Sequence, residues 1–223
     1  MRRFTVSAAA VSAAGFSAFS LAAVLLAAAL ATAAAAEDGE TLMRRFLDKT
    51  PGGKISFLQK SVGRQGETVA ESNGRFWFRR PNLFRMEYDP PDALTAVSDG
   101  ENNWTYQPDL NQVIVRPAQT GGGTSAFLDV LATGDLSPLE NDYILFSGDG
   151  GGLQWFTAEA RTEDRQIRRM RMGFAEDGEL RQVELNDSFG GGAVLEVISL
   201  SRAEANDSLF RFTPPIGADI IRE

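Results

Sequence analysis

The chain has 223 residues and a formal net charge of −8, and it contains neither histidine nor cysteine. Without these two residue types it cannot form a Ser-His-Asp or Cys-His catalytic centre, and it lacks the usual ligands of zinc, haem-thiolate and iron–sulfur sites. The excess of acidic groups argues against a nucleic-acid partner. We therefore expect no metal, no cofactor and no nucleic acid.

Residues 1–36 have the pattern of a cleaved secretory signal peptide. Arg2 and Arg3 form a basic start, an uncharged apolar stretch follows, and Ala34-x-Ala36 suits signal peptidase. A retained transmembrane anchor is the alternative, because the apolar stretch is long enough to span a bilayer. The pattern predicts export of the chain, with residues 37–223 forming a single domain.

Two amphipathic patches predict short helices at residues 40–48 and 125–131, and each carries one apolar stripe. The stripes comprise Leu42, Met43, Phe46 and Leu47 in the first helix, and Phe127, Leu128 and Leu131 in the second. Pro51-Gly52-Gly53 ends the first helix, and the glycine run 121–123 precedes the second.

Elsewhere apolar residues recur at every second position, which predicts β-strands separated by hairpin-like turns. The main runs lie at residues 55–57, 76–78, 83–88, 113–115, 143–146, 153–158, 167–174, 180–185, 194–200 and 210–212. About ten or eleven strands are expected, without βαβ alternation, so they form one antiparallel sheet. A sheet of this size curls, and the two helices would plug its concave face. The predicted fold is mainly β, an unclosed antiparallel barrel with short helices.

The run "FWFRRPNLFRMEY" at residues 76–88 combines rings and arginines. On a strand Phe76 and Phe78 face one side while Trp77 and Arg79 face the other, so the run offers one aromatic wall and one mixed face. Pro81 breaks the ladder, because proline has no N–H to donate. The rings are expected to line an interior, and the arginines to lie near its rim.

Three separated motifs carry a resemblance to a known family. "RPNLFRMEY" (80–88) is followed by "VSDGENNWTYQPDLNQV" (97–113) and then by "FRFTPPIGADI" (210–220). In this order, and over nearly all of residues 37–223, the chain resembles the LolA family of periplasmic carriers that take lipoproteins to the outer membrane. The resemblance implies an unclosed β-barrel around a hydrophobic cavity for acyl chains, covered by an α-helical lid.

The resemblance also implies roles for single residues and partners. Arg80 would hold the lid shut through hydrogen bonds to its backbone, a task that suits the planar guanidinium, and Phe84 would belong to the hydrophobic entrance. The cargo would be acylated lipoproteins, loaded in the periplasm by an inner-membrane LolCDE-type ABC transporter and passed to an outer-membrane LolB-type receptor or inserted directly. The carrier would act as a monomer and make or break no bond.

The expected cavity lining consists of inward-facing rings and methionines, which adapt to disordered acyl chains. These residues are Phe57, Phe76, Phe78, Phe84, Met86, Trp104, Tyr106, Met170 and Met172. The inward face of the lid would comprise Leu42, Met43, Phe46, Phe127, Leu128 and Leu131. Each of these residues also fits an ordinary core position.

Two other functions are compatible with the sequence. The same fold could bind another lipid or glycolipid, or sense lipoprotein stress. A hydrolase could use paired carboxylates such as Glu163/Asp164 or the cluster Glu176, Asp177 and Glu179, although these lie beside glycines or polar residues in turn-like settings. We therefore predict no catalytic residue.

Overall fold

The computed structural model describes residues 37–118 and 126–223, and residues Glu37–Glu223 form one compact unit. The expected signal peptide and the glycine run 121–123 lie outside the described residues. Within the described ranges no helix is long and apolar enough to cross a membrane.

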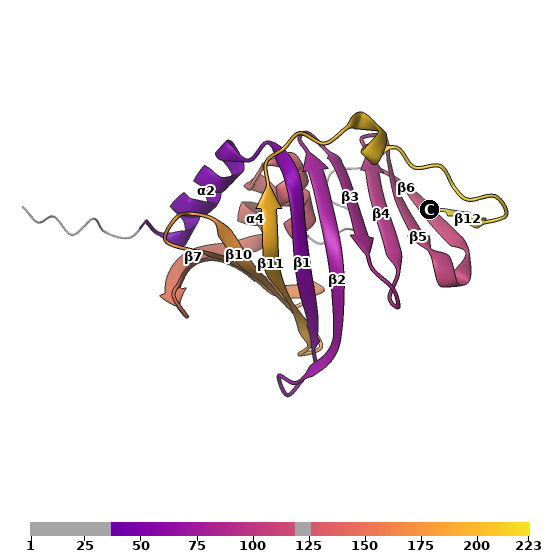
Figure 1. Cartoon of the computed structure of the whole chain (residues 1–223). Helices are drawn as coiled ribbons and strands as arrows, with labels where there is room; N and C mark the ends of the chain where they lie inside the picture. The colour runs from indigo at the N-terminus through magenta and orange to yellow at the C-terminus, as the bar shows by residue number, and fades with distance from the viewer. Residues whose placement is uncertain (1–36, 119–125) are drawn as a thin grey trace, which may run out of the picture. The chain divides into compact units, whose positions relative to one another are not determined.

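Among the described residues twelve strands form a single sheet, in the order β12-β6-β5-β4-β3-β2-β1-β11-β10-β9-β8-β7 (Figure 1). They are β1 (Gly52–Val62), β2 (Thr68–Arg79), β3 (Leu83–Tyr88), β4 (Leu94–Asp99), β5 (Asn102–Gln107), β6 (Gln112–Pro117), β7 (Tyr143–Gly150), β8 (Leu153–Ala160), β9 (Ile167–Phe174), β10 (Leu180–Asp187), β11 (Gly192–Ser201) and β12 (Asp219–Arg222). Neighbouring strands are antiparallel except β12, which runs parallel to β6. The two end strands β7 and β12 do not pair, so the sheet bends without closing. The predicted unclosed antiparallel sheet is confirmed.

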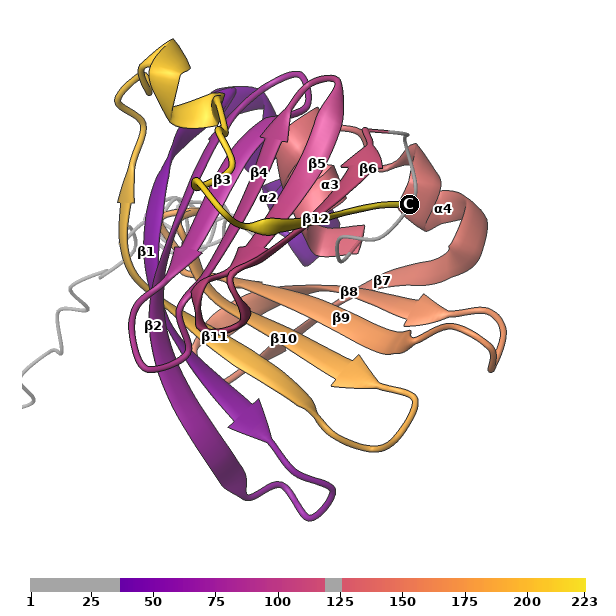
Figure 2. The same cartoon turned by 90° about the vertical axis from the view of Figure 1, so that its right-hand side faces the viewer.

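In the described ranges three α-helices lie on the concave side of the bent sheet (Figure 2). They are α2 (Gly39–Lys49), α3 (Ala126–Thr133) and α4 (Ser137–Asp142). The sequence predicts the first two but not α4, a six-residue helix with a proline in its first turn. The predicted stripe of α2 is buried against the sheet, and Asp38 caps the helix by accepting from the Thr41 N–H at 2.9 Å.

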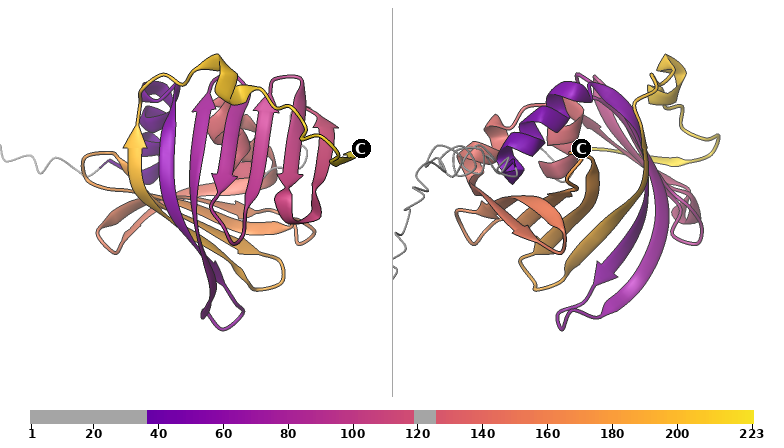
Figure 3. Two further views of the ribbon diagram at one scale, coloured as in Figure 1. Left: turned by 45° about the vertical axis from the view of Figure 1, so that its right-hand side comes forward. Right: turned by 60° about the vertical axis from the view of Figure 1, so that its left-hand side comes forward.

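Helix α2 is fixed to the β7–β8 half of the sheet at its N-terminus (Figure 3). The Glu40 N–H donates to Ser147 Oγ of β7 at 2.9 Å, and Arg44 Nη2 also joins α2 to α4 by donating to a carboxylate oxygen of Glu140 at 2.8 Å. Gly39 touches the sheet backbone, because a Cβ at this position would lie 2.0 Å from the carbonyl oxygen of Trp155. Any larger residue would push the helix away.

The C-terminal segment differs from the sequence prediction. Residues 210–212 do not form a strand; instead the 3₁₀-helix η2 (Asp207–Phe210) ends there, and Pro214 and Pro215 follow. A second short 3₁₀-helix, η1 (Pro108–Leu110), joins β5 to β6. After Pro215 the chain forms β12, a strand that the sequence pattern does not predict. The predicted strand at 210–212 is therefore wrong, and prolines that cannot donate to a ladder are the physical reason.

Candidate functional site

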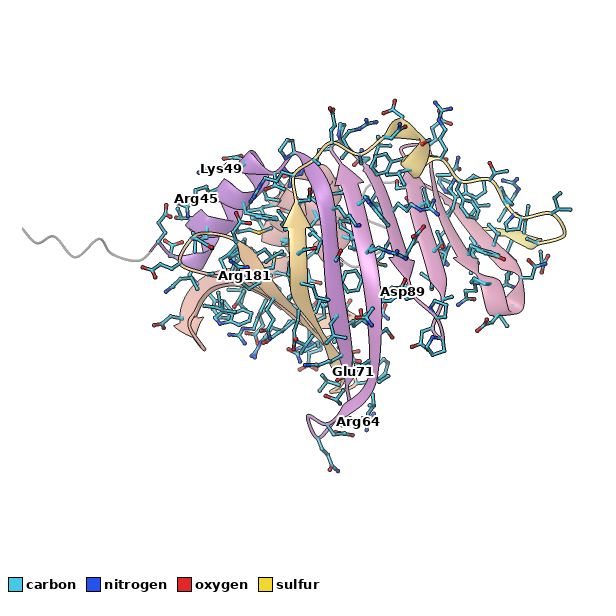
Figure 4. The ribbon with its side chains drawn as sticks, in the orientation of Figure 1. Arg45, Lys49, Arg64, Glu71, Asp89 and Arg181 are labelled. Carbon is cyan, nitrogen blue, oxygen red and sulfur yellow. The ribbon has the colours of Figure 1, made fainter. Side chains whose placement is uncertain are left out.

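The concave face of the sheet is apolar from strand to strand. Ile55 pairs with Phe76 and Phe76 pairs with Met86 across β1 to β3, and Met172 pairs with Val183 across β9 and β10, so apolar rows cross both halves of the sheet. Exposure there is at most 4% for the inner residues Ile55, Phe57, Phe76, Phe78, Phe84, Met170 and Met172. Figure 4 labels charged side chains on α2, on the β1–β2 hairpin and at other positions around the outside. These apolar rows form the floor of the candidate site.

Helix α3 fills the space above this floor. Leu131 is fully buried and Leu128 nearly so. Between them and the sheet remains an apolar cavity of about 20 Å³, lined by Ile55, Phe57, Phe76, Met86, Leu128, Leu131, Leu180, Val183, Leu195 and Val197. A space of this size is close to that of one water molecule, which needs polar partners that this lining lacks. The described state is therefore closed, with the site occupied by the helix itself.

A single side chain joins the C-terminal turns of α2 and α3. Arg80, just after β2, donates from Nε to the carbonyl oxygen of Leu131 at 3.0 Å and from Nη1 to the carbonyl oxygen of Leu47. Carbonyl groups in the last turn of a helix have no partner within the helix and carry partial negative charge. One guanidinium therefore donates hydrogen bonds to main-chain carbonyl groups at the C-terminal ends of both helices. We call α2 and α3 together the lid.

The electrostatics of Arg80 follow from its burial. Loss of hydration lowers the pKa of Arg80 from its ordinary value, and the nearby carboxylate of Asp48 acts in the opposite direction. The guanidinium stays charged at neutral pH because an arginine side chain is protonated under all ordinary conditions. Its Nη2 is buried without a hydrogen-bond partner among the described residues. The contact is therefore charged and only partly satisfied, which leaves part of its burial cost uncompensated.

The backbone around Arg80 is shaped to receive α3. The Asn82 N–H donates to the carbonyl oxygen of Ala132 at 3.0 Å. Gly134 ends α3 with φ of +76°, and a Cβ there would lie 2.8 Å from Cδ of Arg80. Glycine is needed for both reasons, since it adopts positive φ without strain and leaves room for the arginine.

A match to a known protein family identifies the chain to which this site belongs. The model of a family described as outer membrane lipoprotein carrier protein LolA matches residues 48–213. The chain belongs to the LolA family.

Curated relatives agree with this assignment, and a solved structure shares the fold. An outer-membrane lipoprotein carrier protein of Albidiferax ferrireducens is 35% identical over 85% of this chain and 93% of its own length. One from Methylibium petroleiphilum is 38% identical over 85% of this chain and 92% of its own. An uncharacterised conserved protein of Thermus thermophilus shares the fold, with a TM-score of 0.52 and 14% identity over 82% of this chain and 98% of that one.

Most of the residues expected in the cavity lining and in the lid meet at this site. Phe57, Phe76 and Met86 line the remaining cavity, and Leu128 and Leu131 cover it. Phe78, Phe84, Met170, Met172, Leu42, Met43 and Phe46 belong to the same buried cluster. The side chain of Phe127 lies outside the described residues. What these residues bind stays a prediction.

Trp104 and Tyr106 lie on the opposite face of the sheet, so their expected place in the cavity lining is wrong. Trp104 pairs with Val97, donates from Nε1 to Asp99 at 2.8 Å, and packs against Phe212 with ring centroids 5.6 Å apart. The ring of Tyr106 lies 6.2 Å from that of Phe212. A second apolar cluster on the convex face therefore takes both rings.

The carboxylates considered for hydrolysis lie in exposed turns. Asp177 pairs with Arg181, and Glu179 pairs with Arg202. Asp164 accepts a hydrogen bond from Thr162 within the β8–β9 connection. Asp164, Asp177 and Glu179 therefore have polar partners of their own in the described chain.

The sequence pattern does not predict several residues of the site. Leu180, Val183, Leu195 and Val197 supply nearly half of the cavity lining. Their alternation within the predicted runs at 180–185 and 194–200 was the available signal, but it does not show which face is concave. Leu47 and Gly134 contribute to the Arg80 contact through backbone geometry, for which the sequence carries little signal.

Proposed function

We propose that this chain is a periplasmic carrier that binds the acyl chains of lipoproteins released from the inner membrane and delivers them to the outer membrane. The observation that carries the proposal is the closed lid. A continuous apolar floor is covered by helix α3, which Arg80 holds through a main-chain carbonyl rather than through side-chain packing alone. Relatives named outer-membrane lipoprotein carrier protein support it.

The lid gives the carrier a way to bind and to release. Each methylene moved out of water contributes about 0.8 kcal/mol, so acyl chains bind strongly to any large apolar enclosure. The closed cavity of about 20 Å³ cannot hold a chain, and loading therefore requires α3 to leave. Cargo then replaces contacts that Leu128 and Leu131 make in the empty state. Reclosure favours release by the same amount.

An entry path extends from the cavity along the concave face. Beyond the fully buried cluster lie apolar side chains that are only partly buried against it. They include Leu94, Leu145, Ile167 and Leu185, together with Met86, Leu195 and Val197 of the cavity lining itself. An acyl chain could contact this surface before the lid moves, so binding need not begin with a fully open carrier.

The partners that we propose follow from the energetics of the route. Extraction of a lipoprotein from a bilayer needs an energy source, and the sequence contains no G-x-x-x-x-G-K-[ST] phosphate loop. An inner-membrane LolCDE-type ABC transporter would supply that energy. At the outer membrane a LolB-type receptor, or the membrane itself, would accept the cargo.

Release of a radiolabelled lipoprotein from spheroplasts tests the proposal. Purified residues 37–223 are added to spheroplasts that are synthesising lipoproteins, and the label in the supernatant is measured. The expected result is a soluble complex of label and carrier in equal amounts. Label that stays in the membrane, while an established carrier solubilises it, contradicts the proposal. Mass spectrometry of the complex identifies the bound lipid and would reveal a carrier of another lipid class.

A further inference from the structure

The concave face changes from apolar to polar one step beyond the cavity. Phe57 and Met86 line the cavity, and the next inward-facing residues on their strands are Gln59 and Tyr88. Two residues along a strand advance the chain by about 6.6 Å. Gln59 lies between Leu195 on β11 and Ser72 on β2. On β1 and β3 the apolar floor therefore ends at a polar position, which borders Leu195 of the cavity lining.

Gln59 and Tyr88 are joined across the intervening strand. The Tyr88 hydroxyl donates to Oε1 of Gln59 at 2.7 Å. The Tyr88 ring packs edge-on against Phe57, with centroids 5.6 Å apart and planes at 79°. Gly74 makes this possible, because a Cβ there would lie 2.4 Å from Cζ of Phe57. The hydroxyl is thus held in place by the cavity lining itself.

The direction of this hydrogen bond leaves a donor for a ligand. Burial raises the pKa of Tyr88 to about 12, so its hydroxyl keeps its proton and donates. Because Oε1 of Gln59 accepts, the amide nitrogen remains as a donor of two hydrogens, and no described residue accepts from it. A half-buried donor at the end of an apolar floor suits a carbonyl at the end of an apolar chain.

We infer that Gln59 and Tyr88 form a polar subsite for the ester or amide carbonyl that links acyl chains to the rest of the cargo. Gln59 donates to the carbonyl, and Tyr88 is a positioning residue that fixes the amide. This inference rests on the proposed function, since it places the polar end of the ligand relative to acyl chains in the cavity. It also places the ester or amide linkage along the concave face, at the next inward-facing position after Met86 on β3.

Two synthetic lipopeptides test the subsite. One carries two palmitoyl chains in ester linkage on a glyceryl-cysteine peptide, and the other carries hexadecyl chains in ether linkage, which has no carbonyl. Dissociation constants are measured by calorimetry with residues 37–223. The wild type should bind the ester about five- to tenfold more tightly, as expected for roughly one net hydrogen bond. Gln59→Leu should lower this ratio to about one, and Tyr88→Phe should lower it partly.

Tyr143→Phe is the matched control, because the Tyr143 hydroxyl donates to a backbone oxygen of Ile167 at 3.3 Å and lies outside the subsite. Its ester-to-ether ratio should equal that of the wild type. Equal binding of both lipopeptides by the wild type overturns the subsite and leaves the carrier function standing. Equal weakening of both by Gln59→Leu shows a packing role and also overturns it. If the wild type binds neither lipopeptide, the carrier function itself fails.

Discussion

Nε of Arg80 donates a 3.0 Å hydrogen bond to the carbonyl oxygen of Leu131, the residue whose side chain fills the apolar interior. The same guanidinium reaches the carbonyl oxygen of Leu47 in α2. Closure of the lid is therefore coupled to one side chain outside both helices. Release of cargo restores these bonds, so they contribute to the driving force for delivery.

Arg80→Leu should load cargo but deliver it poorly. The substitution removes two hydrogen bonds from a charged donor, each worth about 1.5–3 kcal/mol, and both exist only in the closed state. Transfer of bound lipoprotein to acceptor membranes should slow at least about tenfold, whereas loading stays near the wild-type level. Arg79→Leu is the control, because Arg79 pairs with Asp207 outside the lid. Unchanged transfer by Arg80→Leu would remove this residue from the mechanism.

Gly134→Ala should reproduce part of that defect. The new Cβ would strain a residue at positive φ and press on Arg80, whose Cδ would be 2.8 Å away. Gly151→Ala meets the same backbone strain at φ of +61°, but nothing lies within 4 Å of its Cβ. Both variants should lose about 1 kcal/mol of stability in denaturant unfolding. Only Gly134→Ala should also slow transfer, and equal transfer by both would contradict the coupling.

Leu131→Ala should weaken the fold and strengthen cargo binding. Removing this fully buried side chain costs about 2–5 kcal/mol in the closed state, and a loaded carrier has already given up its contacts. The melting temperature should fall, while affinity for a diacyl lipopeptide rises about tenfold for each 1.4 kcal/mol removed from the cost of opening. Val97→Ala, buried on the convex face, should lower stability without raising affinity. A loss of affinity in Leu131→Ala would show that this residue belongs to the bound state.

Asp129 makes the closed lid sensitive to pH. Burial raises its pKa to about 6 from an ordinary value of 3.8, so the folded chain favours the neutral acid. Below about pH 4 Asp129 is protonated in both the folded and the unfolded chain, so it does not lower the stability of the fold. As pH rises from about 4 to 6 the buried group lowers that stability, and the full loss is reached above about pH 6. Asp129→Asn should therefore raise the melting temperature at pH 7.5 but not at pH 3.5. An equal gain at both values would exclude ionisation as its cause.

The sequence predicts the unclosed sheet because alternation is strong in runs such as 76–88, where Phe76 and Phe78 face inward. The role of Arg80 in holding the lid is predicted by the resemblance of the Arg-Pro-Asn-Leu-Phe motif to the LolA family. It does not predict the side taken by β5, "NNWTYQ", because Trp104 and Tyr106 look like core residues. Here Phe212 provides a second apolar cluster on the convex face, and that partner comes from more than a hundred residues away. Strand β12 escaped for a similar reason, since its pairing with β6 is non-local.

Cysteine cross-linking of the lid gives the most direct test of the central claim that α3 must leave for cargo to enter. The sequence has no cysteine, so an introduced pair cannot form a disulfide with another residue. A disulfide requires Cα atoms about 4.4–6.8 Å apart. The backbones of Asn82 and Ala132 lie close together, because the Asn82 N–H donates to the carbonyl oxygen of Ala132. Asn82→Cys combined with Ala132→Cys should bind no diacyl lipopeptide when oxidised and bind normally after reduction, while each single variant binds in both conditions. Full binding by the oxidised double variant, with its cross-link verified by mass spectrometry, would contradict the account.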